Sequence, residues 1–312
     1  MSLERALELA ERGRGTTHPN PVVGAVVVRD GEVVGEGWHA FKGGPHAEVV
    51  ALGVAGERAH GATLYLTMEP CSHHGSTPPC TAAVLAAGVA RVVAGSLDPN
   101  PEAGGGLDLL RGAGVEVELV DSFAARAQNE AWRLWVAAGR PFVILKLAVT
   151  VDGRLAIPGQ RWVSGEESRR RVHELRAEVD AVAVGGGTVR ADAPTLTARG
   201  VEAARQPRRL AFARGPLPEE SALEQLSGPL EDELRRLAAE GVQSLLLESG
   251  PTLAEAFLRH DLVDKLLLFV VPSLAGTGVQ FAPDLPRPVT LGRLTAEPVG
   301  GDVLLTAYVH EP

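Results

Sequence analysis

The sequence predicts an α/β protein made of two unlike domains, and three observations support this prediction. The chain has 312 residues, which is more than one hydrophobic core usually organises. Strand-type and helix-type segments alternate through both halves, a pattern typical of largely parallel sheets with helices on both faces. A new run of strand-type residues starts at "GRPFVILKLAVTVDG", and no internal repeat relates the two halves. We therefore predict domains at 1–138 and 139–312.

The first domain is predicted to begin with an amphipathic helix over 2–13, whose apolar residues recur at helical spacing. The stretch "NPVVGAVVVRDGEVVGEGWH" then predicts a β-hairpin that turns at Asp30 and Gly31. Helices and strands are expected to alternate after it: helix 47–56, strand 63–67, helix 81–87, strand 91–97, helix 106–113 and strand 115–120. We expect one continuous helix over 121–138 to lead out of the domain.

The second domain is predicted to alternate in the same way. Its expected elements are helix 166–179, strand 181–185, strand 209–213, helix 229–239, strand 243–248, helix 251–259, strand 265–271 and strand 303–309. The segment "KLLLFVV" at 265–271 is apolar on both alternating faces, so it needs cover on both sides. We therefore expect it to be a central strand.

Charge and composition narrow the functional class. The net charge of -9 opposes a nucleic-acid partner, because such binding draws most of its affinity from Lys and Arg neutralising phosphates. The N-terminus is a charged amphipathic segment rather than a signal sequence, and no run of about 18 apolar residues is present. The sequence predicts a soluble cytoplasmic protein that acts on a small molecule and has no membrane partner.

The only two cysteines, Cys71 and Cys80, lie close together in the first half. A disulfide is unusual in a reducing compartment, so these thiols are candidates for ligands, nucleophiles or inert core. Together with His46 they match a tetrahedral catalytic zinc site whose fourth position is open to water. Taken singly, a histidine at a helix start is usually a surface or capping residue, and paired cysteines are more often core packing.

Glu48 lies two residues after His46 and gives this set a chemical purpose. A carboxylate beside an activated water can take its proton and pass it to departing ammonia, which hydrolytic deamination requires. Glu48 is therefore the predicted catalytic acid and base.

The pattern H-x-E followed by P-C and a second cysteine resembles the zinc-dependent cytidine deaminase superfamily. Eight residues, "SHHGSTPP", separate the cysteines, and this longer loop is similar to that of the bifunctional deaminase and reductase family of riboflavin biosynthesis. The resemblance covers essentially the whole chain. Its motifs include "THPNPVVGAVVV", "DPNP", "GRPFVILKLAVTVDGR", "VHELRAEVDAVAVGGGTVRADAPTLTAR" and "LLLESGPTLAEAFL".

This resemblance implies a three-layer α/β/α domain of the cytidine deaminase fold, followed by an α/β domain similar to dihydrofolate reductase. It implies deamination of 2,5-diamino-6-(ribosylamino)pyrimidin-4-one 5'-phosphate, and then reduction of the ribosyl group to ribityl. The implied cofactors are zinc and NADPH.

The resemblance also carries residue roles onto matching positions. Those implied to bind the deaminase substrate are Asn20, His39, His73, Asp98 and Asn100. Those implied to bind the reductase substrate are Lys146, Arg176, Leu196, Arg199 and Glu248. Those implied to bind the cofactor are Ala148, Trp162, Thr188, Asp192 and the segment Gly250, Pro251, Thr252, Leu253, Ala254, Glu255, Ala256.

Chemistry supports several of these assignments. The Gly-Pro turn and helix start at Gly250 form an anion cradle suited to a dinucleotide phosphate. Arg176 and Arg199 suit a substrate phosphate, because guanidinium groups bind phosphate well. Lys146 and Glu248 suit polarisation of the sugar during reduction. We add Arg214 as the candidate cation for the 2'-phosphate of NADPH, with a solvated loop arginine as the alternative.

Three departures from the family pattern stand out. Ser76 occupies a position where the family usually has Lys or Arg, and Ala193 one where an acid or amide is common. The chain is also shortened around 214–241, near the expected adenosine half of the cofactor. We expect a homodimer or higher homo-oligomer, because the shortening removes an element that would help to enclose the second sheet.

Other functions remain as alternatives at this stage. A nucleic-acid or nucleoside base deaminase shares the zinc chemistry but needs a basic groove, which the charge opposes. A zinc-stabilised interaction module would have no use for Glu48. A protein with only one active half is a further alternative.

Overall fold

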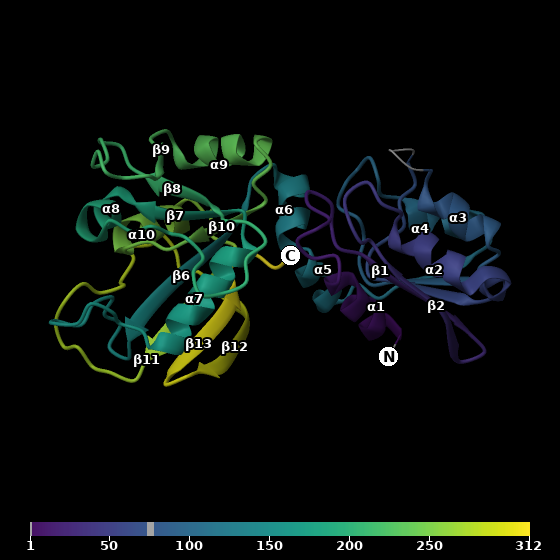
Figure 1. The fold of residues 1–312 in the computed structure, drawn as a ribbon, viewed down its shortest axis with the longest axis horizontal. Coiled ribbons are helices and arrows are strands. Elements are labelled where there is room, and N and C mark those ends of the chain that lie inside the picture. The colour runs from purple at the N-terminus through teal and green to yellow at the C-terminus, as the bar shows by residue number, and fades with distance from the viewer. Residues whose placement is uncertain (1, 74–77) are drawn as a thin grey trace. The chain divides into compact units, whose positions relative to one another are not determined.

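The computed structural model describes residues 2–73 and 78–312, and it divides the chain into two compact units (Figure 1). One unit runs to Ala138 and includes Pro312, and the other is Gly139–Glu311. Within the described residues, no helix has the length and apolar character needed to cross a membrane. Ser76 lies outside the described residues.

The first unit contains a five-stranded mixed sheet in the order β2-β1-β3-β4-β5. Its strands are β1 (Gly24–Arg29), β2 (Glu32–Trp38), β3 (Thr63–Leu66), β4 (Arg91–Ala94) and β5 (Glu116–Leu119). Strand β1 is antiparallel to both β2 and β3, whereas β3, β4 and β5 are parallel. The predicted hairpin is confirmed, with Asp30 and Gly31 both at positive φ in its turn.

Helices cover both faces of this sheet. The helix α1 (Ser2–Glu11) packs its buried Ala6 and Leu9 against Val26 on one face. The other face is covered by α2 (Ala47–Ala55), the 3-10 turn η1 (Gly56–Ala59), α3 (Cys80–Ala86) and α4 (Gly106–Gly112). The predicted three-layer arrangement is confirmed.

The prediction of one continuous helix over 121–138 is wrong. The segment forms α5 (Phe123–Gln128) and α6 (Glu130–Ala138), which are separated at Asn129. The buried Asn129 side chain accepts a hydrogen bond from the Val22 amide and donates one to the Val22 carbonyl, each at 2.9 Å. These two bonds hold Asn129 in a non-helical conformation and so interrupt the helix.

The second unit contains an eight-stranded sheet in the order β12-β13-β11-β6-β10-β7-β8-β9. Its strands are β6 (Phe142–Thr150), β7 (Ala181–Gly185), β8 (Arg208–Phe212), β9 (Glu224–Leu226), β10 (Ser244–Leu247), β11 (Lys265–Val271), β12 (Gly292–Val299) and β13 (Asp302–Tyr308). Strands β11 through β9 in this order are parallel, and β13 and β12 extend the sheet with antiparallel pairing. Strand β11 lies between β13 and β6, so the predicted central strand is confirmed.

The helices of this unit are α7 (Glu166–Glu178), α8 (Gly186–Asp192), α9 (Leu230–Ala239) and α10 (Pro251–Arg259). Buried residues of α9 and α10 pack on the sheet face that carries Val143, Leu145 and Leu247. The start of α7 is fixed to β13, because Asp302 accepts hydrogen bonds from the Gly165 amide and the Ser168 hydroxyl.

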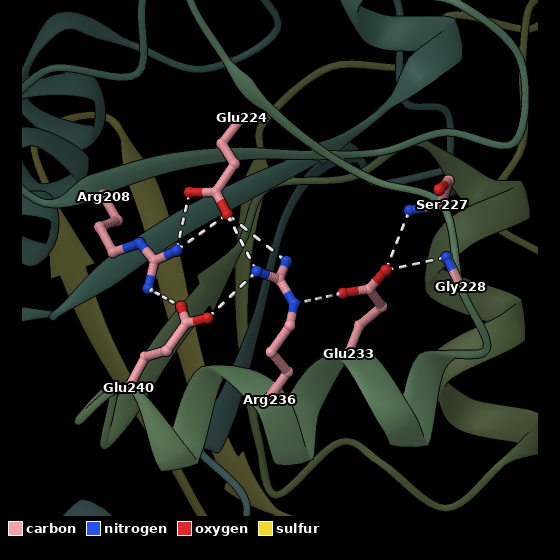
Figure 2. Close-up of polar contacts among 7 residues, drawn as sticks. All are labelled: Arg208, Glu224, Ser227, Gly228, Glu233, Arg236 and Glu240. Carbon is pink, nitrogen blue, oxygen red and sulfur yellow. Dashed lines mark hydrogen bonds and ion pairs between the residues drawn. The ribbon is translucent and has the colours of Figure 1, made fainter.

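A network of arginines and glutamates holds the short edge strand β9 to α9 (Figure 2). Arg208 donates to both oxygens of Glu224, at 2.8 and 2.7 Å, and to Glu240 at 2.6 Å. Arg236 bridges Glu224 and Glu240 from the helix. Single exposed pairs of this kind contribute little, but a shared network can fix the geometry of a short strand.

Candidate active sites

Three side chains from separate segments of the first unit meet at one point. His46 precedes α2, Cys71 follows β3, and Cys80 is the first residue of α3. The His46 Nδ1 atom lies 3.2 Å from the Cys80 Sγ atom and 3.7 Å from the Cys71 Sγ atom. All three ligand atoms lie within 4.8 Å of one another, which suits three ligands around one small cation.

Local backbone structure favours thiolate at this point. The Cys80 amide donates a hydrogen bond of 3.3 Å to the Cys71 Sγ atom at the start of α3. A hydrogen bond from the Cys80 thiol, with the His46 ring and this amide in support, lowers the pKa of Cys71. A thiolate is the form of cysteine that binds metal ions.

Glu48 lies beside this group on the first turn of α2 and is 3% exposed. Within the described residues, its Oε2 atom is buried without a hydrogen-bond partner. Burial raises the pKa of Glu48 above that of an ordinary carboxyl. A buried carboxylate oxygen without a partner is costly unless a ligand satisfies it, so the residues present fit a zinc ion with its water.

Two predicted substrate residues flank the ligands. The buried His39 ring lies edge-on to the His46 ring with centroids 5.4 Å apart, and its Nδ1 atom is 3.1 Å from the Pro45 carbonyl oxygen. Asn20 reaches the His39 Nε2 atom at 3.5 Å. Burial lowers the pKa of His39, which favours the neutral ring. With Nδ1 at the Pro45 carbonyl, the Nε2 atom is the one that can hydrogen-bond to a substrate.

Glu69, a residue for which we predicted no role, joins the loop before Cys71 to the loop that carries Asp98 and to α4. This residue is 6% exposed and accepts hydrogen bonds from the Asp98 amide at 3.2 Å and the Leu107 amide at 3.0 Å. Asp98 in turn accepts from the Asn100 amide at 2.8 Å. The acid directly before the P-C dipeptide was the available signal for this role.

The loop that carries Cys71 is also held by close packing. A Cβ atom placed on Gly106, the first residue of α4, would lie 1.9 Å from the Pro70 carbonyl oxygen. Only glycine allows the helix to approach the backbone this closely. His73 is exposed, and none of its contacts in the described structure places it at the ligand group.

In the second unit, three charged residues gather where β10 ends beside the middle of β6. Glu248 follows β10 and accepts hydrogen bonds from Arg176 of α7 at 2.6 and 2.9 Å. Burial alone would raise the pKa of Glu248, but the Arg176 hydrogen bonds and the Lys146 charge bring it below its usual value. Burial lowers the pKa of Lys146, whose Nζ atom lies 5.8 Å from the Phe269 ring centroid.

The neighbouring loop contributes the other predicted substrate residues. Arg176 also donates to the Thr197 carbonyl at 3.2 Å, so its guanidinium is largely occupied within the protein. Leu196 has a φ of 54° and a side chain that is 2% exposed, so it offers backbone rather than side-chain contacts. Arg199 is exposed and donates to the Thr195 hydroxyl at 3.1 Å.

A cavity of about 1150 Å³ lies in the second unit, beside β7, β8, β9 and β10. It is lined by segments that follow the carboxyl ends of these four parallel strands, where ligands bind in open α/β sheets. The predicted cofactor residues that line it are Thr188, Asp192, Arg214, Gly250, Pro251, Thr252, Leu253 and Ala256.

Other predicted cofactor residues do not line this cavity. Ala148 lies on β6 opposite Phe269, and Trp162 is 53% exposed between Arg161 and Arg169. Ala254 is fully buried, and Glu255 accepts a hydrogen bond from the Asp284 amide.

The cavity wall also contains residues that the sequence analysis missed. Its outer side is formed by α8 and by the end of β9, neither of which was predicted; the lining residues there are Arg190, Ser227 and Gly228. Glu233 of α9 accepts from the Ser227 and Gly228 amides at 3.1 and 2.8 Å, which fixes this part of the wall (Figure 2). The volume of the cavity and the helix start at Gly250 fit a dinucleotide.

Comparisons with known proteins agree with both halves of this description. Residues 2–96 match the family model "Cytidine and deoxycytidylate deaminase zinc-binding region", and residues 141–305 match "RibD C-terminal domain". The chain is 40% identical to the riboflavin biosynthesis protein RibD of Aquifex aeolicus, over 89% of this chain and 88% of that protein. It is 41% identical to the protein of the same name from Escherichia coli, over 91% and 90%.

Solved structures agree as well. A RibD structure from Acinetobacter baumannii has a TM-score of 0.84 at 35% identity and covers 98% of this chain and 97% of its own. A Thermotoga maritima structure described as a diaminohydroxyphosphoribosylaminopyrimidine deaminase and 5-amino-6-(5-phosphoribosylamino)uracil reductase has a TM-score of 0.82 at 34% identity, with the same coverage.

The fold and the two sites define an enzyme that joins a zinc-dependent deaminase domain to a reductase domain. The predicted fold class is thereby confirmed for both halves. The chain belongs to the RibD family of riboflavin biosynthesis proteins and is a bifunctional deaminase and reductase.

Proposed function

We propose that the first domain deaminates the ring of 2,5-diamino-6-(ribosylamino)pyrimidin-4-one 5'-phosphate, with His46, Cys71 and Cys80 as the zinc ligands. Zinc held there supplies a Lewis acid that makes water acidic enough to attack at neutral pH. The observation that carries the proposal is the buried Glu48 carboxyl beside the three ligands, whose Oε2 atom has no hydrogen-bond partner within the described residues.

Glu48 moves the protons of this reaction. It accepts the two protons of the attacking water in turn and delivers one to the ring nitrogen and the other to the leaving amine, so that the ring gains a carbonyl oxygen and releases ammonia. The raised pKa of Glu48 suits both roles, because the carboxyl must hold a proton between the two steps. Asn20, His39, His73, Asp98 and Asn100 are the proposed contacts to the substrate.

The second domain then reduces the ribosyl group to ribityl, with NADPH as the source of reducing equivalents. Lys146 orients and polarises the sugar, and its lowered pKa makes it a stronger proton donor than an exposed lysine. Glu248 keeps Lys146 and Arg176 in place through charge and hydrogen bonds. Leu196 and Arg199 complete the proposed substrate site, with the free end of Arg199 as the phosphate contact.

The cofactor occupies the cavity beside β7 to β10. Its pyrophosphate lies at the N-terminus of α10, where unpaired amides and the helix dipole favour an anion. Thr188 lies next to this point, since its Oγ1 atom is 4.0 Å from the position of a Cβ atom on Gly250. Ala148 and Trp162 remain proposed cofactor contacts.

The proposed assembly is a homodimer, and the proposed location is the cytoplasm. A homodimer through the second domain is supported by apolar side chains exposed near one edge of its sheet, including Leu294 at 63% and Val303 at 41%. The two free thiols, which the zinc site needs in reduced form, support a cytoplasmic location.

Separate assays of the two half-reactions test the proposal, each run with and without NADPH. Glu48→Gln should abolish deamination and leave both zinc content and the reductase unchanged, because the amide keeps the shape but cannot carry a proton. Glu57→Gln, which alters an exposed acid just beyond α2, is the matched control. Deamination by the Glu48 variant at the rate of the control would refute the role of this residue.

A further inference from the structure

Two arginines line the proposed cofactor cavity without an acidic partner within the described residues. Arg190 lies on α8, and Arg214 follows β8. Within the described residues, neither side chain forms an ion pair or a hydrogen bond. Most other arginines of this domain are paired with acids, as Arg208 and Arg236 are in Figure 2. Two unpaired cations at one cavity attract an anion.

The Arg190 side chain reaches the backbone that leads to Arg214. A Cβ atom placed on Gly186 would lie 3.3 Å from the Arg190 Nη1 atom and 2.8 Å from the Ala213 Cβ atom. The guanidinium of Arg190 therefore reaches back over the first turn of α8 toward the residue that precedes Arg214. The missing side chain at Gly186 leaves space for this approach.

Acids along the cavity do not cancel these charges. Glu231 is bonded to the His260 ring at 2.6 Å. Asp192 is the last residue of α8, so it lies about 9 Å along the helix axis from Gly186. The surface around Gly186 and Ala213 is consequently a local region of positive charge.

The position of this region matches one part of a dinucleotide. The helix start at Gly250 follows β10, whereas Arg214 follows β8, and β7 separates the two strands. Neighbouring strands lie about 4.8 Å apart, so the two points are roughly 10 Å from each other across the sheet. A second anion at that distance from the pyrophosphate corresponds to the phosphate on the adenosine ribose.

We propose that Arg190 and Arg214 together hold the 2'-phosphate of NADPH and thereby select NADPH over NADH. The inference rests on the proposed cofactor cavity and names the residues of this chain that determine its specificity. A phosphate monoester carries nearly two charges at neutral pH, so two guanidinium groups neutralise it better than one. NADH offers only a hydroxyl at this point and gains little from either arginine.

Equilibrium binding tests the proposal without turnover. The full-length zinc-loaded protein is added stepwise to NADPH or to NADH, and the fluorescence of the reduced nicotinamide ring is followed. The dissociation constant of each cofactor is measured at one fixed salt concentration. Arg190→Gln and Arg214→Gln should each weaken NADPH binding about tenfold, which is about 1.4 kcal/mol at 25 °C. Affinity for NADH should be unchanged, and the double variant should bind the two cofactors equally.

Arg235→Gln is the matched control, because it removes an exposed arginine of α9 that pairs with Asp232 and does not line the cavity. A double variant that keeps the wild-type preference would overturn the proposal. A single variant that behaves like the control would remove that arginine from it. Wild-type protein that binds neither cofactor would contradict the proposed cavity itself, whereas equal binding of both would contradict only the arginine pocket.

Discussion

Arg176 and Glu248 form a bidentate ion pair in which the guanidinium Nε and Nη2 atoms lie 2.6 and 2.9 Å from the two carboxylate oxygens. The pair joins α7 to the end of β10, and both side chains are nearly buried, at 12% and 11% exposure. It also places a negative charge close to Lys146, so the lysine remains compatible with a buried position. The ion pair between Arg176 and Glu248 thus holds the charged residues of the reductase site in place.

Removal of Arg176 should therefore be costly. Arg176→Gln removes the hydrogen-bonded cation from the buried Glu248 and leaves only the charge of Lys146 near it, and losses of a buried ion-pair partner amount to about 3–5 kcal/mol. In the wild type the lowered pKa of Glu248 stabilises the fold above the ordinary carboxyl pKa, and this contribution disappears as the pH falls through the lower folded value. In the variant the carboxyl can be protonated, so the deficit should be largest at pH 7 and shrink toward pH 5.

Urea unfolding of both proteins at several pH values measures this difference. Arg171→Gln, on the same helix with a partly exposed side chain, is the control for general charge effects. A deficit that stays constant with pH would show that Glu248 does not titrate in the way proposed.

The metal site gives a second prediction. The protein should bind about one zinc ion per chain, because within the described residues His46, Cys71 and Cys80 form the group suited to hold it. Cys71→Ser replaces a thiolate by a weak hydroxyl ligand and should lower the zinc content to a small fraction. Elemental analysis after gel filtration measures this. Full zinc content in the variant would place the metal elsewhere.

Gly106 gives a third prediction. Gly106→Ala places a methyl group 1.9 Å from the Pro70 carbonyl oxygen, so either α4 or the loop before Cys71 must shift. Overpacking of this kind costs about 1–3 kcal/mol. We expect lower thermal stability together with faster loss of zinc to a chelator.

Gly112→Ala on the same helix is the matched control, because a Cβ atom there meets nothing within 4 Å. It should be neutral or slightly stabilising, since alanine is preferred to glycine in a helix. If both variants retained zinc equally, the close contact with Pro70 would not be what positions the cysteine loop.

The parts of the structure that the sequence predicted are those with strong local signals. The hairpin has its turn at Asp30, the helix from Pro251 has a Gly-Pro start, and the strand from Lys265 is a continuous apolar run. The ligand trio was predictable because metal chemistry restricts residue types so strongly. Segments without such signals were missed: β9 has three residues, β12 is an edge strand with a proline, and α8 starts with two glycines.

Long-range contacts explain the remaining differences. Nothing local shows that Asn129 bonds to Val22 and interrupts a helix, or that Glu69 bonds to the amides of Asp98 and Leu107. Nothing local shows either that the Arg190 side chain lies beside Gly186 and close to Ala213, which follows β8. These relationships depend on sheet order, which the alternation of elements alone does not determine.

The last prediction concerns assembly. Strand β12 lies at one end of the eight-stranded sheet, and most of its residues are exposed, including Leu294 at 63%. An exposed edge strand with apolar side chains tends to pair or become covered, and a symmetric dimer is the commonest way to cover it. Light scattering at micromolar concentration should therefore give a mass near twice the 32.7 kDa of one chain.

Leu294→Lys should shift the equilibrium toward the monomer, whereas Leu109→Lys, which changes an exposed leucine of α4 in the first domain, should leave it unchanged. A wild-type mass near 32.7 kDa that does not rise with concentration would mean that this edge stays uncovered in a stable monomer.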